Sequence, residues 1–384
     1  MSIRSHIVTQ GRNENSTCVY FPTCQGCSHW HISYQEQINQ KINQLSNIFK
    51  MHGLKHPPID FISCGESALR TRVDFTIQKL TPCQQVMGFY NKQKELLDIN
   101  TCLQLMPALQ NFYSEFQKIQ FPIKKGSARL RVGPSGLKGC WLDFSNLDIK
   151  KLLDDPVFFN QFIEHNIEVE VGQKGKRVIR SNAGYKLADP IPMAWFETYD
   201  QNLKPLPLKG LVSDFTQPSW LTAQTMTSLL FEWTANLTEG ASVIEFGPGL
   251  GQFTIPLLTK GFKVSVYESN SKATEALQLN AKELNLAAHL QIQLGDFQNA
   301  AVAAKVTPEL VLVNPPRSGL KKFTYELIKT QSKKCIYISC FPESMANDLA
   351  LLTAAGYTIQ DLKIVDQFPQ TSHYETCVLL EKII

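Results

Sequence analysis

The spacing of hydrophobic residues changes near residue 211 and divides the chain into two parts. In the second part, β-branched and aromatic runs alternate with stretches of helical periodicity. The expected strands are residues 242–246, 263–268, 290–294, 310–314 and 334–338, preceded by a helix over 220–237. Strands separated by helices predict a parallel, doubly wound α/β sheet. The last two runs, 357–365 and 377–381, leave no room for a helix, so we expect an antiparallel pair that completes a mostly parallel, seven-stranded sheet.

The first part alternates between apolar and polar residues, as antiparallel strands with one buried face do. The expected strands are residues 72–78, 86–90, 96–99, 129–132 and 141–144, with a helix near 155–165. An earlier helix over 31–52 carries Ile38, Ile42, Leu45 and Phe49 on one face, and we expect this face to pack on the domain that follows. Leu203–Gly210, with two prolines and a glycine, is typical of a linker. The expected domains are therefore 1–60, 61–210 and 211–384.

Composition and charge narrow the class of protein. Residues are 43% hydrophobic and 19% charged, and no apolar run is long enough to cross a membrane or to act as a signal peptide. We therefore expect a cytoplasmic protein with no membrane partner. Lys and Arg exceed Asp and Glu in residues 1–210, and segments 118–138 and 172–186 contain no acid. Such segments indicate either a solvated basic face or a site for a polyanion such as nucleic acid.

Three of the ten cysteines lie close together at Cys18, Cys24 and Cys27, in a loop that Pro22 and Gly26 keep out of regular structure. Zinc is one candidate for this site, but structural zinc sites usually use two cysteine pairs, and the sequence has no second pair. Three clustered cysteines plus a distant one are typical of iron-sulfur proteins. Cys102, directly after an expected strand, is the preferred fourth ligand. The alternatives are Cys64, Cys83 and Cys140.

Cys340 ends an expected strand and is followed by Pro342, which stops the strand and begins a helix. A cysteine at the carboxyl end of a strand in an open α/β sheet is well placed for a nucleophile. A buried core cysteine is the alternative.

The first strand of the second part runs into a glycine-rich loop that contains Glu245, Gly247, Gly249 and Gly251. Such a loop permits close approach of a nucleotide-like ligand. Polar residues end the next three strands: Glu268, Asp296 and Asn314, the last followed by two prolines. We interpret this pattern as a site for S-adenosylmethionine rather than for a dinucleotide, with Glu268 on the ribose and Asp296 near the adenine.

These motifs together resemble the RNA uracil-5-methyltransferase family. The family's iron-sulfur loop is matched by Cys18, Cys24, Cys27 and Cys102, and its methyl-donor motifs by Phe215–Gln217 and Glu245–Gly251. Its catalytic cysteine strand is matched by Ile338–Cys340 and its closing signature by Asp366–Glu375. Only 17 residues precede Cys18, so the chain is similar to the short ribosomal RNA members that lack an N-terminal barrel.

The resemblance implies a class I S-adenosylmethionine-dependent methyltransferase domain, a preceding β-rich RNA-binding domain and a [4Fe-4S] cluster. It implies that Cys340 attacks carbon 6 of a uridine, that Glu375 removes the proton from carbon 5, and that Gln217 contacts the methyl donor. The expected substrate is structured RNA, with 23S ribosomal RNA as the target and the protein acting as a monomer. Transfer RNA is the alternative target, and a catalytically silent RNA-binding homologue is the alternative function. The family usually has Asp at Asn314, and Asn at both Phe341 and Ser219.

Overall fold

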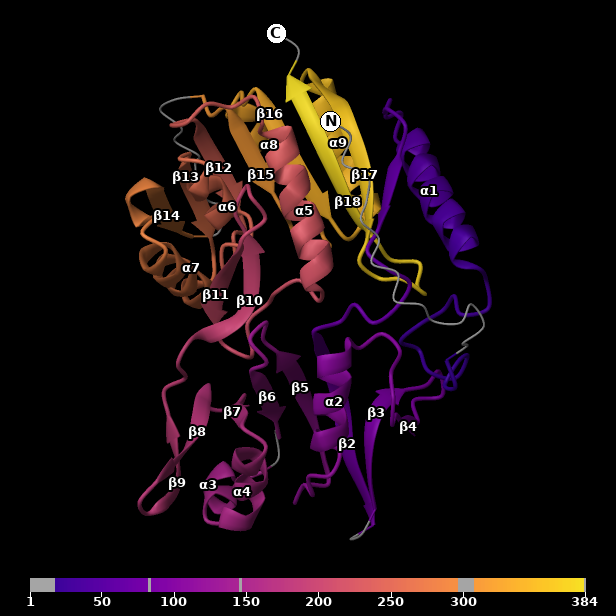
Figure 1. Ribbon diagram of the computed structural model, residues 1–384. Helices are drawn as coiled ribbons and strands as arrows, with labels where there is room; N and C mark the ends of the chain where they lie inside the picture. The colour runs from indigo at the N-terminus through magenta and orange to yellow at the C-terminus, as the bar shows by residue number, and fades with distance from the viewer. Residues whose placement is uncertain (1–17, 82–83, 145–146, 296–306, 383–384) are drawn as a thin grey trace. The chain divides into compact units, whose positions relative to one another are not determined.

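The computed structural model describes residues 18–81, 84–144, 147–295 and 307–382, which form two compact units (Figure 1). Unit 1 contains the described residues up to His31 together with Gly65–Phe196 and Lys209–Ser219. Unit 2 contains Ile32–Cys64, Glu197–Leu208 and the residues from Trp220 onwards. None of the described helices is long and apolar enough to span a membrane.

Unit 1 is built on an eight-stranded sheet in the order β4-β3-β2-β5-β6-β7-β8-β9. Its strands are β2 (Arg72–Thr81), β3 (Gln84–Tyr90), β4 (Leu96–Asp98), β5 (Lys125–Val132), β6 (Lys138–Asp143), β7 (Ile167–Val171), β8 (Lys176–Ser181) and β9 (Gly184–Ala188). Neighbours are antiparallel except β6 and β7, which are parallel. A parallel pair needs a crossover, and α3 (Ile149–Leu153) and α4 (Pro156–Glu164) provide it.

Aromatic side chains form the core of unit 1. Phe116, from α2 (Pro107–Phe116), packs edge-to-face on Phe75 and Phe162, with ring centroids 5.7 and 6.1 Å apart, and Phe121 lies 5.3 Å from it. These rings come from β2, α2, α4 and the loop between α2 and β5, so the cluster packs both helices onto the sheet.

The segment expected as a linker is a strand instead. β11 (Pro205–Gly210) pairs with β10 (Met193–Tyr199) in a two-stranded ribbon through which the division between the units passes. Pro205 is the first residue of β11, where its missing N–H is tolerated, and an edge position accepts Pro207 for the same reason.

Unit 2 carries the expected doubly wound sheet, in the order β1-β17-β18-β16-β15-β12-β13-β14. The strands are β1 (Asp60–Ser63), β12 (Ser242–Phe246), β13 (Lys263–Glu268), β14 (Leu290–Leu294), β15 (Leu310–Val313), β16 (Lys334–Ser339), β17 (Tyr357–Asp366) and β18 (Glu375–Lys382). β18 runs antiparallel to β16 and β17, as predicted. β13 pairs with one side of β12 and β15 with the other side, so the order of the strands reverses between β12 and β15. Ligands of open α/β sheets bind at such a switch point.

The sheet has eight strands rather than the predicted seven because β1 adds to its edge, parallel to β17. The preceding helix α1 (Tyr34–Met51) packs in the same unit, and not on the β-rich domain that follows it in sequence. Its Leu45, Ile48 and Phe49 join a core that contains Leu349 and Leu352 of α9 (Pro342–Ala354). A short exposed strand such as β1 has no periodicity strong enough to assign it to a distant sheet.

The remaining helices of unit 2 are α5 (Trp220–Trp233), α6 (Thr254–Thr259), α7 (Ser271–Glu283), α8 (Phe323–Lys329) and the 3₁₀ turn Ala287–His289. One face of the sheet is covered by α1, α8 and α9, whose apolar residues share a single buried cluster with alternate residues of the strands. The polar residues described below lie at or directly after the carboxyl ends of β12, β13, β15 and β16.

Candidate active site and cysteine cavity

Cys340 lies directly after β16, and its neighbour across the sheet is set by strand pairing. Ser339 of β16 is paired with Thr376 of the antiparallel strand β18. Because the strands are antiparallel, the residue after Ser339, Cys340, lies opposite the residue before Thr376, Glu375. The register therefore brings the thiol and the carboxyl to the same end of the sheet. Cys340 is half-buried, whereas Glu375 is 4% exposed.

A cation lies beside the two acidic groups. Arg317, in the loop after β15, donates a hydrogen bond to the Cys340 thiol and also acts on Glu375 through its charge. Burial and the Glu375 charge raise the pKa of Cys340 above its usual value, and Arg317 opposes this shift. Arg317 therefore favours the thiolate, the form of cysteine that acts as a nucleophile.

Burial also raises the pKa of Glu375 to about 8, against a hydrogen bond from Gln367 and the charge of Arg317. Gln367 Nε2 donates to Glu375 Oε1 at 2.9 Å, and Thr222 Oγ1 donates to Gln367 Oε1 at 2.6 Å. The threonine hydroxyl thus fixes the orientation of the amide, whose N–H group faces the carboxylate. A carboxyl group with a pKa near neutrality is suited to general acid–base catalysis.

Phe341, the residue after the cysteine, is 38% exposed and occupies the N-cap position of α9 without a side-chain cap. Its N–H donates to Ser339 Oγ at 3.1 Å, which fixes the turn that presents Cys340. An exposed aromatic ring beside a half-buried cysteine offers a surface on which a nucleic acid base can stack.

The glycine-rich loop lies at the switch point of the sheet. Gly247 has a φ of 72°, and a Cβ there would lie 3.5 Å from the carbonyl oxygen of Asn314, which follows β15. Gly251 has a φ of 99°, and a Cβ there would meet Leu277 of α7 at 2.6 Å. The positive φ therefore favours glycine at both positions, and close packing against Leu277 adds to this at Gly251. Gly249 also has a positive φ, of 56°, and nothing lies within 4 Å of its Cβ direction.

The two glutamates of this region differ in their environment. Glu245 is 2% exposed and accepts a hydrogen bond from Thr254 Oγ1 at 2.6 Å, and burial raises its pKa to about 8. Glu268, at the end of β13, accepts from the Asn270 N–H at 2.9 Å and from the Gly249 N–H at 3.4 Å. The Glu268 carboxylate therefore braces the loop after β12.

Two expected donor residues are not among the described residues of unit 2. Gln217 belongs to unit 1, whereas the other described donor residues belong to unit 2. Asp296 lies outside the described residues.

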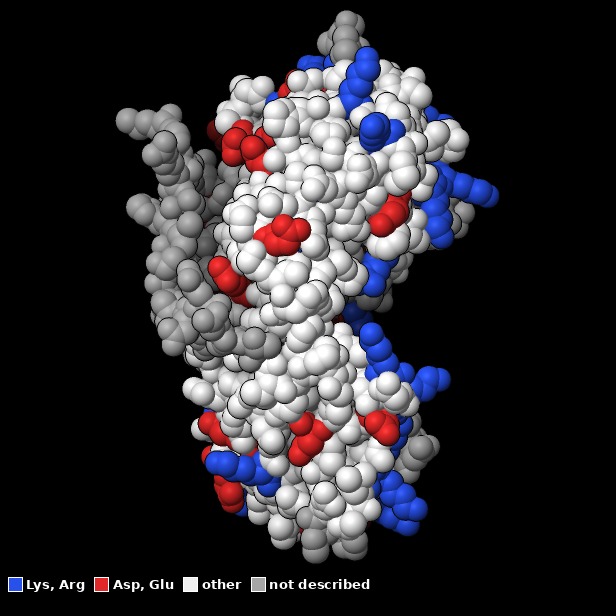
Figure 2. All heavy atoms as spheres, turned by 90° about the vertical axis from the view of Figure 1, so that its right-hand side faces the viewer, with Lys and Arg blue, Asp and Glu red and all other residues white. Residues whose placement is uncertain are grey.

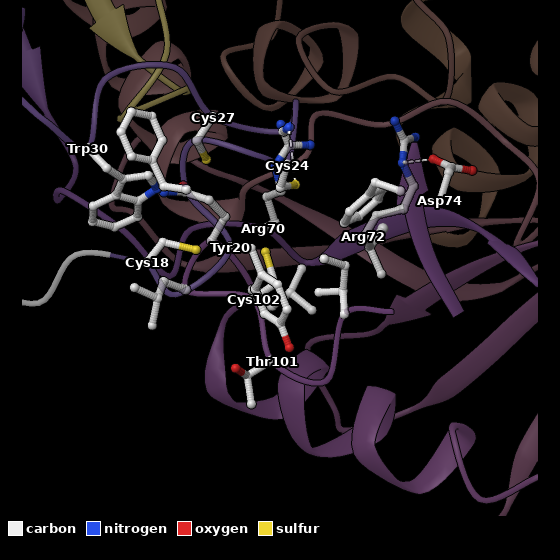
Figure 3. Close-up of a pocket in the computed structure, with 18 residues that line it drawn as sticks. Cys18, Tyr20, Cys24, Cys27, Trp30, Arg70, Arg72, Asp74, Thr101 and Cys102 are labelled. Atoms are coloured by element: carbon white, nitrogen blue, oxygen red, sulfur yellow. Dashed lines mark hydrogen bonds and ion pairs between the residues drawn. The ribbon is translucent and has the colours of Figure 1, made fainter. Parts of the chain in front are cut away.

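Unit 1 contains a cavity of about 210 Å³ that is lined by four cysteines, Cys18, Cys24, Cys27 and Cys102. Figure 3 shows their sulfur atoms around this cavity, with Arg70 and Trp30 in its walls. The rival Cys140 is fully buried, Cys64 belongs to unit 2 and Cys83 lies outside the described residues. The four cysteines that we expected from the sequence as metal ligands thus line one cavity.

The four thiols that line the cavity are side chains of a type that binds metals, but they are not arranged around a single ion. Within the described ranges, no group of three or more His, Cys, Asp or Glu side chains could hold a metal ion. Burial raises the pKa of the Cys24, Cys27 and Cys102 thiols, and Arg70 opposes this shift at Cys27 and Cys102.

The basic segments of unit 1 are partly neutralised within the unit. Arg131 is 1% exposed and donates to the backbone carbonyls of Leu211 and Asp214. Arg129 pairs with Asp74 at 2.6 Å, and Lys138 pairs with Glu115 at 2.5 Å. The exposed basic residues of the two segments are Lys118, Lys124, Lys125, Lys174, Arg180 and Lys186. On the face drawn in Figure 2, basic and acidic side chains are both present among uncharged ones.

The sequence interpretation missed the roles of Arg317, Gln367 and Thr222. Arg317 and Gln367 stand within motifs that were recognised, but nothing in their spacing shows that they contact Cys340 and Glu375. Thr222 lies about 150 residues before Glu375, and only the fold brings it to Gln367.

The doubly wound sheet with this loop at its switch point is the architecture of a domain that binds a nucleotide-like ligand. A family model described as tRNA (Uracil-5-)-methyltransferase matches residues 209–383. An RNA methyltransferase of Bdellovibrio bacteriovorus is 38% identical over 376 residues, which cover 95% of each chain. The chain therefore belongs to the RNA uracil-5-methyltransferase family and is an S-adenosylmethionine-dependent enzyme.

Two other similar proteins have named substrates. The 23S rRNA (uracil(1939)-C(5))-methyltransferase of Halomonas elongata is 26% identical over 95% of this chain and 76% of its own. The crystal structure of Pyrococcus abyssi tRNA (uracil-54, C5)-methyltransferase with S-adenosyl-L-homocysteine matches with a TM-score of 0.69 and 20% identity. It covers 94% of this chain and 86% of that chain. This structural likeness shows the shared fold.

Proposed function

We propose that this enzyme methylates carbon 5 of a specific uridine in 23S ribosomal RNA, with Cys340 as the nucleophile and Glu375 as the base. The observation that carries the catalytic assignment is the pairing of β16 with β18, which gathers the thiol and the carboxyl beside Arg317. Methylation of an unactivated pyrimidine carbon requires a nucleophile and a base, and Arg317 adds a cation beside both groups.

The reaction divides into three steps. The Cys340 thiolate forms a bond to carbon 6 of the uracil, and the electron pair of the 5,6 double bond moves to carbon 5 and its enolate. S-Adenosylmethionine supplies the methyl group that this carbon takes up. Glu375 then removes the proton from carbon 5, the electron pair restores the double bond, and the bond between sulfur and carbon 6 breaks. Arg317 stabilises the thiolate both before attack and on departure.

The last step should depend on pH through Glu375. The base must be ionised, and the pKa of Glu375 is raised to about 8. The rate of product release should therefore rise about tenfold per pH unit below pH 8 and level off above it. Rapid quenching of a preformed adduct at a series of pH values measures this rate. A flat profile would exclude Glu375 as the base.

We assign the methyl donor to the loop after β12 and to the neighbouring strand ends. The proposed contacts are Gln217, Glu245, Gly247, Gly249, Gly251, Glu268, Asp296 and Asn314. The support is the positive φ at the three glycines and the position of the loop at the switch point. The Glu268 carboxylate, already held by two N–H groups, can accept from ribose hydroxyls with its remaining lone pairs.

We also propose that Cys18, Cys24, Cys27 and Cys102 hold a [4Fe-4S] cluster, because all four line one cavity of unit 1. Protein purified without oxygen should contain about four iron and four sulfide per chain. Cys102→Ser should lose most of this iron, whereas Cys64→Ser, from the other unit, should keep it. Stoichiometric zinc without sulfide, or full iron content in Cys102→Ser, would contradict the assignment.

The ribosomal target is supported by the relative from Halomonas elongata, whose name gives 23S rRNA as its substrate. Mapping of 5-methyluridine in RNA from cells lacking the protein tests it. We expect one or more uridines of 23S rRNA to lose the methyl group and to regain it when the purified enzyme is added. Loss of 5-methyluridine from transfer RNA alone would show that transfer RNA, the alternative target, is the substrate. Unchanged methylation in both would refute it.

A further inference from the structure

The N-terminal half of α1 has buried polar residues where an amphipathic helix normally has apolar ones. Tyr34, Gln37 and Lys41 follow one another at spacings of three and four and so lie on one face of the helix. Gln37 is fully buried and Lys41 is 1% exposed. Lysine is almost never buried unless it is paired. These side chains therefore have a specific set of partners.

Most of these partners lie in the segment 366–375, which connects β17 to β18 and ends at Glu375. The exceptions are Ser63, which shares a hydrogen bond with Tyr34, and the Ile32 carbonyl, which accepts from Gln37. Lys41 Nζ donates to Asp366 Oδ1 at 2.7 Å and to the Phe368 carbonyl at 3.2 Å, and Tyr34 Oη donates to Asp366 Oδ2 at 2.9 Å. Asp366 is fully buried. Its carboxylate also accepts from the Phe368 N–H at 3.2 Å, so it joins the helix to the start of the segment.

A second set of bonds holds the middle of the segment. Gln37 Nε2 donates to Gln370 Oε1 at 2.9 Å, and the Gln370 N–H donates to Gln37 Oε1 at 2.9 Å. The side-chain N–H and the side-chain oxygen of Gln37 thus both bind the same residue, Gln370. Gln370 has a positive φ of 65°, a conformation that a non-glycine residue adopts rarely and that such bonds help to hold.

The segment fixed in this way contains Gln367, the residue that orients the base. Gln367 directly follows Asp366, and its amide donates to Glu375 at 2.9 Å. A displacement of the Asp366 backbone would therefore move the donor that sets the position and charge of Glu375.

We infer that Tyr34, Gln37 and Lys41 of α1 form a clamp that positions Glu375, through Asp366 and Gln367, for removal of the carbon 5 proton. This inference rests on the proposed role of Glu375. The three helix residues are positioning residues, because they bind Asp366, Phe368 and Gln370 of the segment that carries Gln367. The expected consequence is selective: the clamp matters for release of the product and not for attack by Cys340.

The test compares Lys41→Met and the milder Tyr34→Phe with the wild type in two single-turnover measurements. The first is formation of the covalent complex with RNA that contains 5-fluorouridine, which requires no base. The second is breakdown of the complex with ordinary RNA. Formation should keep the wild-type rate, whereas breakdown should slow about 10–10²-fold, as for a catalytic group displaced by about 1 Å. Lys363→Met, which removes the ion pair of Lys363 with the exposed Asp60, should change neither rate.

The background variant Glu375→Gln separates positioning from general loss of structure. If the clamp acts through Glu375, Lys41→Met should add no further slowing of breakdown in that background, because the two effects are not independent. Wild-type breakdown in both clamp variants, or equal losses in formation and breakdown, would overturn the clamp. If Lys41→Met does not fold, Tyr34→Phe decides by the same criteria. Normal turnover by Glu375→Gln itself would instead refute the proposed base.

Discussion

Glu375→Gln enzyme should accumulate a methylated covalent complex with ordinary RNA, and Cys340→Ala should form no such complex. The first variant keeps the thiol and Arg317 but lacks the carboxylate that we propose as the base for the carbon 5 proton. Removal of a general base costs about 10²–10⁴ in rate, which is enough for the adduct to persist. The second variant has no sulfur to form the bond to carbon 6.

A denaturing gel with labelled RNA distinguishes these outcomes directly. Glu381→Gln is a suitable control, because Glu381 lies on the same strand β18, is 41% exposed and pairs with Lys334 away from Cys340. It should turn over as the wild type does. RNA with 5-fluorouridine should trap the wild type after methyl transfer, because fluorine cannot leave as a proton does. A covalent complex in Cys340→Ala would show that another residue is the nucleophile.

Asp348→Ala should strongly lower the stability of unit 2. Asp348 of α9 is 4% exposed and accepts from the Leu320 N–H at 2.7 Å, from Thr324 Oγ1 at 2.9 Å and from Tyr337 Oη at 2.6 Å. Its loss leaves three buried donors without this acceptor, and each unsatisfied group costs about 1–3 kcal/mol. We therefore expect a loss of at least about 3 kcal/mol, which is at the upper end of the usual effects of single mutations.

Hydrogen exchange of the α9 amides measures this loss without assuming that both units unfold together. Asp60→Ala is the matched control: its carboxylate is 63% exposed and pairs with Lys363, so it should cost no more than about 1 kcal/mol. Asp348 also binds the backbone of Leu320, three residues after Arg317. The variant should therefore loosen the loop that positions Arg317 beside Cys340. A loss below about 1 kcal/mol would show that the loop after β15 is held in another way.

Local patterns in the sequence were sufficient for much of unit 2. The alternation of β-branched runs and helices predicted β12 to β16, and the absence of space for a helix predicted the antiparallel β17 and β18. The glycine-rich loop and the cysteine at a strand end were recognised because each depends on residues adjacent in the chain. Turn conformation and strand periodicity are local properties, so a sequence can specify them without knowledge of the fold.

Other features depended on contacts between distant segments. The pairing of β1 with β17, the packing of α1 within unit 2 and the strand at Pro205–Gly210 differ from the sequence interpretation. On α1 the predicted apolar face included Ile38 and Ile42, whereas the buried face begins with Gln37 and Lys41. Those two polar residues are buried because Gln370 and Asp366 lie opposite them, more than 300 positions later.

The sequence by itself determined the class of chemistry, because a nucleophile, a donor loop and a cysteine cluster each require particular residue types at short spacings. Only the tertiary structure decided which groups act on one another: Arg317 on Cys340, Thr222 on Gln367, and α1 on the segment that ends at Glu375. The physical reason is that strength and direction of a buried polar contact depend on distance and burial, and both are fixed only when the whole sheet has assembled.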